Sequence, residues 1–234
     1  MKLNRNTSNS LLKLSSLVYR EHRDKFGGQQ YQPKKKPYMR YREIEVVEEI
    51  LYNLQPTSCL EWGAGSSTLF FPPKLSPKAR WVSIEHQLAW VERIQNLQPS
   101  SIVSIHHIPA NQLPWTDEMQ DGAYADLADY IEYPEQFAPY DFILVDGRAR
   151  NHCIQKAFGL IKPEGVVVLH DANRKSYHAS FERYSNQVLF RGYRPHAGGI
   201  WIGSRGISIS EVLDVERHQA VWRLCRIVGK IFRC

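Results

Sequence analysis

Short apolar segments alternate along the chain with segments whose apolar residues recur at helical spacing, and this rhythm restricts the fold more than any other feature. The strand-like segments are Ser58–Trp62, Arg80–Glu85, Ser101–Ile108, Tyr140–Val145 and Gly165–Leu169. The helix-like segments are Arg42–Leu54, Ser66–Phe71, Leu88–Leu97 and Asn151–Ile161. Apolar strands that alternate with amphipathic helices are typical of a parallel sheet with helices on both faces. The sequence therefore predicts an α/β fold.

The rhythm changes after Gly165–Leu169. Tyr177–Asn186 has helical spacing, and two further strand-like segments, Val188–Tyr193 and Gly199–Ile202, follow it. The turn-forming residues between those two segments predict an antiparallel hairpin. The tail, Ser210–Phe232, is predicted to be a helix with one apolar face.

At 234 residues the chain has the length of one α/β domain with extensions. We expect a basic N-terminal extension over 1–41, the folded domain over 42–206 and a basic amphipathic helix over 207–234. Residues 109–139 form a long connection rich in aromatic and acidic residues, and such connections often serve as lids or binding loops. We predict a helix near Tyr124–Ile131 and an acceptor-binding lid; the alternative is a surface helix without a binding role.

The composition favours a cytoplasmic protein. No apolar run reaches the roughly 18–20 residues that span a bilayer, and the basic N-terminus lacks the apolar core of a signal peptide. The four cysteines, at 59, 153, 225 and 234, are scattered, as expected of reduced thiols rather than of a disulfide framework or a zinc site. The formal net charge is +6, with much of the excess at the two ends. Basic ends could contact nucleic acid, an anionic membrane surface or an acidic substrate, or be plain solvated surface.

The segment from Cys59 to Thr68 carries the first chemical signal. A strand ends near Glu61, a turn contains Gly63 and Gly65, and a helix begins with Ser66, Ser67 and Thr68. Glycines let a ligand approach the backbone, and the N–H groups of a helix start attract an anionic group. The Glu61 carboxylate repels phosphate but suits an ammonium group, and Thr68 stands where a dinucleotide fingerprint has its third glycine. The loop therefore favours S-adenosylmethionine, which has an amino group and no phosphate, over NAD.

A second acid, Glu85, ends the next strand-like segment and is followed by His86. A carboxylate at that point can accept hydrogen bonds from both ribose hydroxyls of an adenosine. In isolation such a residue could be a solvent-facing glutamate, but its distance from the glycine turn is typical of a nucleoside site. We therefore assign Glu85 and His86 to cofactor binding.

Four motifs in order give the chain a family resemblance. Glu61-x-Gly63-x-Gly65-x-Ser67-Thr68, Glu85, the segment Tyr140–Gly147 and the segment Leu160–Asp171 resemble the motifs of class I S-adenosylmethionine-dependent methyltransferases. The resemblance covers roughly residues 42–205. It implies a Rossmann-like, doubly wound, seven-stranded sheet, mostly parallel, with a C-terminal antiparallel hairpin. One departure is that Ile108-Pro109-Ala110-Asn111 stands where the family commonly has an acid-alanine pair that holds adenine.

The acceptor side of the site is predicted from two strand ends. Asp146 ends the fourth strand, and His170 and Asp171 end the fifth, so these side chains should lie together. The layout resembles that of small-molecule and sugar O-methyltransferases, which implies that Asp146 and Asp171 hold Mg²⁺ and lower the pKa of an acceptor hydroxyl. The match is partial, because the asparagine that follows the second acid in the catechol type is replaced by Ala172. The alternative is that Asp146 orients the acceptor and His170 acts as general base, which makes both catalytic.

Arg148 and Arg150 follow Asp146-Gly147 directly and could bind a carboxylate or phosphate of the acceptor, or pair with the acidic insertion. The sequence thus predicts O-methylation of a small molecule or a carbohydrate. A methyltransferase of RNA or protein would explain the basic ends, but the chain has Asp146-Gly147-Arg148-Ala149 instead of the Asn-Pro-Pro-Tyr-type segment that aligns a planar nitrogen, so nucleic acid is disfavoured. A non-catalytic docking module is the third alternative.

Overall fold

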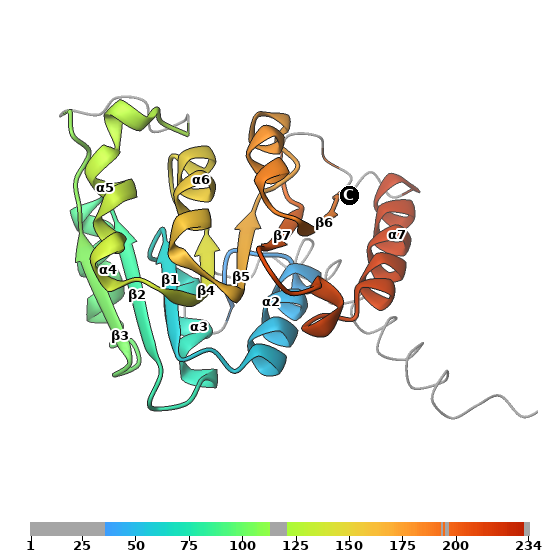
Figure 1. Ribbon diagram of the computed structural model, residues 1–234, viewed down its shortest axis with the longest axis horizontal. Coiled ribbons are helices and arrows are strands. Elements are labelled where there is room, and N and C mark those ends of the chain that lie inside the picture. The colour runs from blue at the N-terminus through green and yellow to red at the C-terminus, as the bar shows by residue number, and fades with distance from the viewer. Residues whose placement is uncertain (1–35, 113–120, 193, 195–196, 232–234) are drawn as a thin grey trace, which may run out of the picture.

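The computed structural model describes residues 36–112, 121–192, 194 and 197–231. In this part of the chain seven strands form one sheet in the order β3-β2-β1-β4-β5-β7-β6 (Figure 1). The strands are β1 (Ser58–Trp62), β2 (Arg80–Glu85), β3 (Val103–His107), β4 (Tyr140–Val145), β5 (Ile161–His170), β6 (Asn186–Phe190) and β7 (Ile200–Ser204). β1 to β5 pair in parallel, and β7 runs antiparallel to both β5 and β6. The predicted Rossmann-like sheet with an antiparallel hairpin is confirmed.

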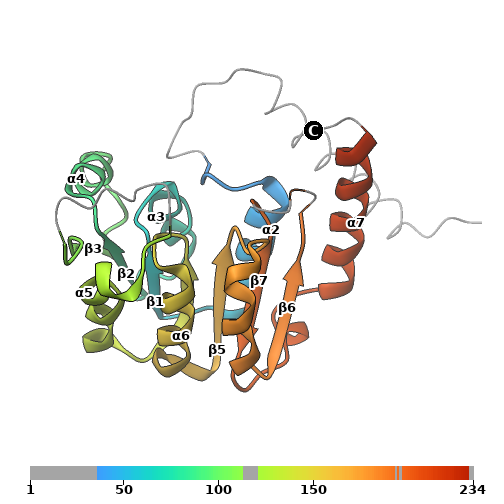
Figure 2. The ribbon, with the colours of Figure 1, turned by 90° about the horizontal axis from the view of Figure 1, so that it is seen from above.

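Helices cover both faces of the sheet (Figure 2). One face carries α2 (Tyr41–Leu54), α3 (Ser66–Phe70) and α4 (Leu88–Asn96), and the other carries α5 (Ala128–Glu132) and α6 (Arg150–Leu160). The last helix, α7 (Val215–Ile231), packs beside β6 and α2. The remaining helical turns are of the 3-10 type: Pro72–Lys74, Tyr124–Asp126, Tyr133–Phe137, Lys175–Arg183 and Ile209–Glu211.

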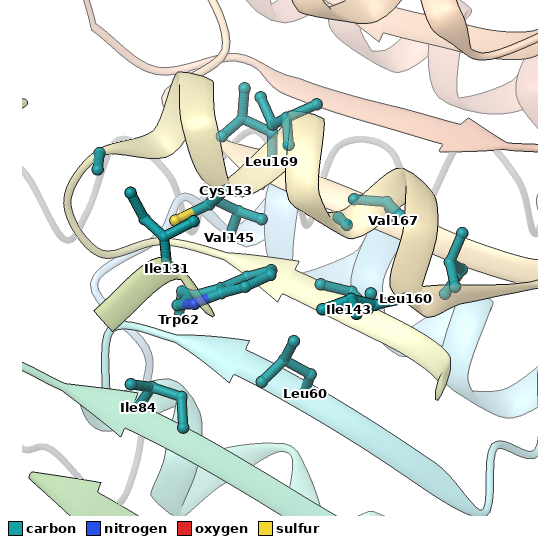
Figure 3. Packing of buried hydrophobic residues seen from close by; sticks show 14 of the residues in the cluster. Leu60, Trp62, Ile84, Ile131, Ile143, Val145, Cys153, Leu160, Val167 and Leu169 are labelled. Carbon is teal, nitrogen blue, oxygen red and sulfur yellow. The ribbon is translucent and has the colours of Figure 1, made fainter. Parts of the chain in front are cut away.

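Each central strand contributes to two separate cores, which explains why the strands are apolar throughout. Alternate side chains of a strand point to opposite faces, so Ile143 and Val145 of β4 pack with α5 and α6, whereas Phe142 and Leu144 pack with α2 and α7. Figure 3 shows the first of these cores, with Trp62 of β1 lying against Ile131 of α5 and Val145. Each face of the sheet packs against its own apolar layer. A shift of one residue in the register of a strand would turn all its side chains to the opposite face, where they do not fit.

Two segments differ from the sequence-based expectation. The strand expected over Gly165–Leu169 begins earlier, at Ile161, and its pairing with β4 is interrupted by a bulge between Tyr140 and Phe142. Pro163 cannot donate to the ladder, so it lies in the irregular part of the strand. Tyr177–Asn186 was expected to be helical, and the structure has a 3-10 helix over Lys175–Arg183.

The described part of the connection over 109–139 contributes side chains to the core. The helix predicted near Tyr124–Ile131 is present as a 3-10 turn over Tyr124–Asp126 followed by α5. Leu127, Tyr130 and Ile131 are almost fully buried against the sheet. Trp62 Nε1 donates to the Tyr130 carbonyl over 3.1 Å, which joins α5 to β1. Residues 113–120 lie outside the described residues, so the lid remains a prediction.

The C-terminal helix is attached to the domain by buried side chains. Val221, Trp222 and Cys225 of α7 are buried, and the Arg42 guanidinium of α2 stacks on the Trp222 ring at 4.5 Å. His218 Nε2 lies 2.9 Å from Glu49 Oε2 of α2. Arg223 and Arg226 face solvent, and contact of this basic helix with an anionic surface remains a prediction. None of the helices in the described ranges is long and apolar enough to cross a membrane.

Candidate functional site

The site lies where the central parallel strands end. The carboxyl ends of β1, β2, β4 and β5 meet at one edge of the sheet because these strands pair in parallel. Each is followed by a loop, and the loops after β1 and β4 touch: an added Cβ on Gly63 would lie 2.5 Å from Gly147 Cα. In open α/β sheets this edge, near the point where the strand order reverses, is where ligands bind. The structure thus brings the predicted cofactor loop and the predicted acceptor residues together.

Gly63 is required by its backbone conformation. Its φ is +98°, a region that residues with a side chain rarely adopt, and its N–H donates to the Ile84 carbonyl over 2.8 Å. The close approach to Gly147 leaves no room for a Cβ. Gly65, in contrast, has only Trp90 Nε1 and Ser67 Oγ within 4 Å of an added Cβ, at 3.7 and 3.9 Å, so its surface has room for a ligand.

Replacing Gly63 with alanine is expected to lower the free energy of unfolding by about 2–3 kcal/mol, because the positive φ and the contact with Gly147 both oppose a side chain. Urea denaturation of the purified variant measures this loss. Gly159→Ala is the matched control: the residue lies in α6 with nothing within 4 Å of an added Cβ, so alanine should raise stability by up to about 1 kcal/mol. Equal behaviour of the two variants would contradict this account of the loop.

Glu61 lies inside the protein, beneath the loop. Its side chain has no exposed surface, and its carboxylate accepts hydrogen bonds from Ser67 Oγ, from Thr68 Oγ1 over 2.7 Å, from Ser83 Oγ over 2.7 Å and from Trp81 Nε1 over 3.0 Å. Burial raises the pKa of the Glu61 carboxyl, and the four hydrogen bonds offset part of that rise. With both oxygens occupied, Glu61 ties the loop and α3 to β2. This geometry does not support the direct contact with an ammonium group that the sequence suggested.

The hydroxyl groups at the start of α3 serve the same purpose. Ser66, Ser67 and Thr68 are all buried, and Thr68 Oγ1 also accepts the Gly65 N–H over 2.8 Å. The side chains of Ser67 and Thr68 therefore fix the shape of the glycine turn, and contact of Ser66 with a cofactor remains a prediction.

Glu85 is placed as predicted, at the end of β2 beside the glycine turn. Its Oε1 accepts the N–H groups of His86 and Gln87 over 2.9 Å each, and His86 Nδ1 lies 2.8 Å from the same oxygen. Within the described part of the chain, Oε2 makes no hydrogen bond. Trp90 of α4 donates through Nε1 to the Ala64 carbonyl, which holds the start of α4 against the loop. One Glu85 oxygen thus orders the chain that follows β2, and binding of a ribose by the other remains a prediction.

His170 lies between two carboxylates at the ends of β4 and α2. Its Nδ1 is 2.8 Å from Asp146 Oδ1, and its Nε2 is 3.2 Å from Glu43 Oε2. Burial alone would lower the pKa of His170, but Asp146 and Glu43 outweigh it and hold the pKa well above its ordinary value. A ring that carries protons on both nitrogens cannot accept another. This geometry argues against the predicted general base and gives His170 the role of an imidazolium that holds Asp146 in place.

Glu43 was not among the residues predicted from the sequence. Its Oε1 accepts the Gly199 N–H over 3.1 Å and its Oε2 accepts the Arg40 N–H over 2.8 Å, so the carboxylate joins the start of α2 to β7 and to His170. The sequence pattern could have indicated this residue. Glu43 shares a helix face with Val47 and Ile50, at spacings of i+4 and i+7, and the other residues of that face are apolar. An acid on the buried face of a helix indicates a fixed partner.

Arg150 does not lie at the rim, where it was expected to bind the acceptor. It is buried in the first turn of α6, and its guanidinium lies 3.2 Å from Asp146 Oδ1 and 3.7 Å from Asp171 Oδ2. The prediction failed because the helix begins at Arg150, after Ala149 at φ +49°, and this turns the side chain inward. Arg148 is half-buried on the loop, and its role in acceptor binding remains a prediction.

The residues present do not fit the predicted Mg²⁺ ion. Asp171 Oδ1 accepts the Gly198 N–H over 2.6 Å, and Asp171 Oδ2 faces the guanidiniums of Arg150 and Arg174. Burial alone would raise the pKa of Asp171, but the neighbouring cations outweigh it and lower the pKa. Among the described residues, no three histidine, cysteine or acidic side chains are grouped as metal ligands. The carboxylates are engaged by protein cations instead.

Comparison with known proteins gives a match in structure only. No family model and no curated protein matches the chain. A methyltransferase-like protein from Silicibacter pomeroyi DSS-3 matches with a TM-score of 0.51 at 18% identity, covering 80% of this chain and 98% of that one. Spermidine synthase from Thermotoga maritima has a TM-score of 0.53 at 15% identity, covering 81% and 72%. The O-methyltransferase from Bacillus cereus, in complex with S-adenosylhomocysteine (SAH), has a TM-score of 0.50 at 16% identity, covering 82% and 90%.

These identities are too low to transfer a substrate or a site residue, but the arrangement of the elements is shared. The strand order 3-2-1-4-5-7-6 with an antiparallel β7 agrees with the predicted resemblance. The chain therefore has the Rossmann-like fold of class I S-adenosylmethionine-dependent methyltransferases.

Proposed function

We propose that this protein is an S-adenosylmethionine-dependent methyltransferase that modifies a hydroxyl group of a small molecule or a carbohydrate. The observation that carries the proposal is the pairing of the Gly63–Gly65 turn with Glu85 at adjacent strand ends. One Glu85 oxygen accepts the N–H groups of His86 and Gln87, and among the described residues the other makes no hydrogen bond. The fold and the SAH complex of a structurally similar O-methyltransferase support it.

In the proposed reaction the glycine turn and Glu85 hold the cofactor. When bound, S-adenosylmethionine would supply an electrophilic methyl group to the acceptor oxygen, with S-adenosylhomocysteine as the leaving group. The proton of the acceptor hydroxyl would pass to the protein. Asp146 is the protein group suited to bind that hydroxyl: its side chain is partly exposed, and within the described residues its Oδ2 makes no hydrogen bond. Because His170 and Arg150 both hold Oδ1, Asp146 acts mainly by orienting the hydroxyl, and it accepts the proton at Oδ2 as the oxygen reacts.

The direct test is calorimetric titration with SAH and, separately, with NAD. We expect SAH to bind and to raise the melting temperature, since a ligand that binds only the native state stabilises it. Binding of NAD without binding of SAH would contradict the proposal.

Glu85→Ala should weaken SAH binding by about 1–3 kcal/mol, because the ribose hydroxyls lose a charged acceptor. Glu85 also accepts the N–H groups of His86 and Gln87 in the turn before α4, so the melting temperature of the variant without ligand is recorded as well. Glu85→Gln keeps an oxygen for this turn and should recover stability more than affinity. Glu92→Ala, an exposed position on the same helix, serves as the control and should bind SAH as the wild type does. Unchanged affinity in Glu85→Ala would remove Glu85 from the site.

A further inference from the structure

The two strand-end carboxylates are bridged by a cation that belongs to the chain itself. Arg150 reaches Asp146 through NH2 and Asp171 through NH1, over 3.2 and 3.7 Å, and only 6% of its surface is exposed. A sequence that places acids at the ends of the fourth and fifth strands suggests a metal site, and the structure has a guanidinium between them.

The guanidinium is fixed by more than these two ion pairs. Its Nε donates to the Gly147 carbonyl over 2.9 Å, its NH1 to the His170 carbonyl over 2.8 Å and its NH2 to the Asp146 carbonyl over 3.1 Å. Arginine has five N–H donors in a rigid planar fork, so one side chain can hold the backbone ends of β4 and β5 together with the two carboxylates. Burial alone would lower the pKa of Arg150, but Asp146 and Asp171 outweigh it and raise the pKa, so the cation persists.

A divalent ion would have to compete with this arrangement. Mg²⁺ prefers an octahedral set of oxygen ligands, whereas Asp146 Oδ1 is already shared by Arg150 and His170, and Asp171 Oδ1 is held by the Gly198 N–H. Two buried positive groups next to the carboxylates would also repel the ion. To admit a metal between the two carboxylates, Arg150 would have to leave its five acceptors inside the protein.

We propose that the Arg150 guanidinium is the resident cation of this site, that it bridges Asp146 and Asp171 in place of a divalent metal, and that this carboxylate pair therefore binds no divalent ion. The inference concerns the site of the proposed methyl transfer but stands apart from that reaction, because metal binding is measured without an acceptor.

The test uses Mn²⁺ as a paramagnetic probe, with binding to the SAH-treated protein followed by electron paramagnetic resonance. We expect no saturable Mn²⁺ binding at the carboxylate pair in the wild type. Arg150→Met removes the cation and keeps an apolar stem of similar length, so the variant should bind Mn²⁺ at least tenfold more tightly than the wild type. Adding Asp171→Asn to Arg150→Met should abolish the gain. Arg150→Lys is the matched control, since it keeps the charge and should not gain the site.

Saturable Mn²⁺ binding to the wild type that is lost in Asp171→Asn would overturn the inference. A folded Arg150→Met protein that gains no affinity for Mn²⁺ would also overturn it. If Arg150→Met does not fold, the test is the comparison of Mn²⁺ binding between the wild type and Asp171→Asn, and no saturable binding in either protein supports the inference. Failure of SAH to bind, with the Mn²⁺ results as expected, would reject the methyltransferase proposal and leave the resident cation in place.

Discussion

Replacing Glu61 with leucine is expected to lower the free energy of unfolding by roughly 3–5 kcal/mol, enough to unfold a domain of ordinary stability. Four polar groups point at this one buried carboxylate: the hydroxyls of Ser67, Thr68 and Ser83 and the indole N–H of Trp81. Leucine is close to glutamate in size but accepts no hydrogen bond. The three hydroxyls would then be buried without their acceptor, and the Trp81 N–H would keep only Ser83 Oγ, at 3.1 Å.

Two variants separate hydrogen bonding from packing and charge. Glu61→Gln keeps one acceptor oxygen, and the serine hydroxyls can rotate to accept from its amide, so the loss should be clearly smaller than with leucine. Glu164→Leu changes an exposed glutamate in β5 and should stay within about 0.5 kcal/mol of the wild type. Urea denaturation measures all three. Equal losses for leucine and glutamine at position 61 would show that the hydrogen bonds are not what holds the loop.

The pH dependence of the Glu61→Gln comparison has a definite sign. Burial raises the pKa of Glu61 above the ordinary value of 4.5, so the folded state binds this proton more tightly than the unfolded state does. The contribution of Glu61 to stability is therefore largest below pH 4.5 and declines as the pH rises through the folded pKa. The stability of the wild type relative to Glu61→Gln should fall over that interval.

Much of the fold could be predicted because it depends on local patterns. Strands that are apolar throughout, separated by amphipathic helices, leave few alternatives to a covered parallel sheet, and glycines mark the turns where β1 and β4 end. The start of β5 was less predictable. Pro163 and Gly165 are strong turn formers, and only the pairing of Tyr140 with Ile161 extends the strand back beyond them.

The site was predictable in its positions but not in its partners. Glu61 and Ser83 are direct neighbours in the register of β1 and β2, and that register is set by tertiary packing. His170 and Glu43 lie 127 residues apart in sequence, and no local spacing connects them. The helix was predicted to begin at Asn151, whereas α6 begins at Arg150. This difference of one residue decides whether the Arg150 side chain faces solvent or the core. Sequence patterns thus identified residues that matter, while their charge states and contacts required the structure.

Glu43→Leu should also cost roughly 3–5 kcal/mol in unfolding free energy, because it breaks a buried ion pair and leaves His170 with one carboxylate instead of two. The His170 imidazolium would keep only Asp146, and the Gly199 N–H would lose its acceptor. Glu43→Gln removes the charge but keeps an acceptor, so its loss should be smaller. Glu48→Gln is the control on the same helix: its ion pair with Lys74, at 3.4 Å, is largely exposed and should contribute little.

The pH profile of the Glu43 variants distinguishes an ion pair from simple packing. The carboxylates hold the pKa of His170 well above the ordinary value of 6.5, so this proton stabilises the fold fully below about pH 6.5, and the stabilisation is lost as the pH rises through the folded pKa. Removing the Glu43 charge lowers that folded pKa. The loss should then still begin near pH 6.5 but end at lower pH, with Asp146 still facing the ring. Nitrogen-15 NMR of the histidine ring follows the same proton directly. An unchanged His170 titration in Glu43→Gln would show that Asp146 alone holds the imidazolium, and that Glu43 contributes only its hydrogen bonds to Arg40 and Gly199.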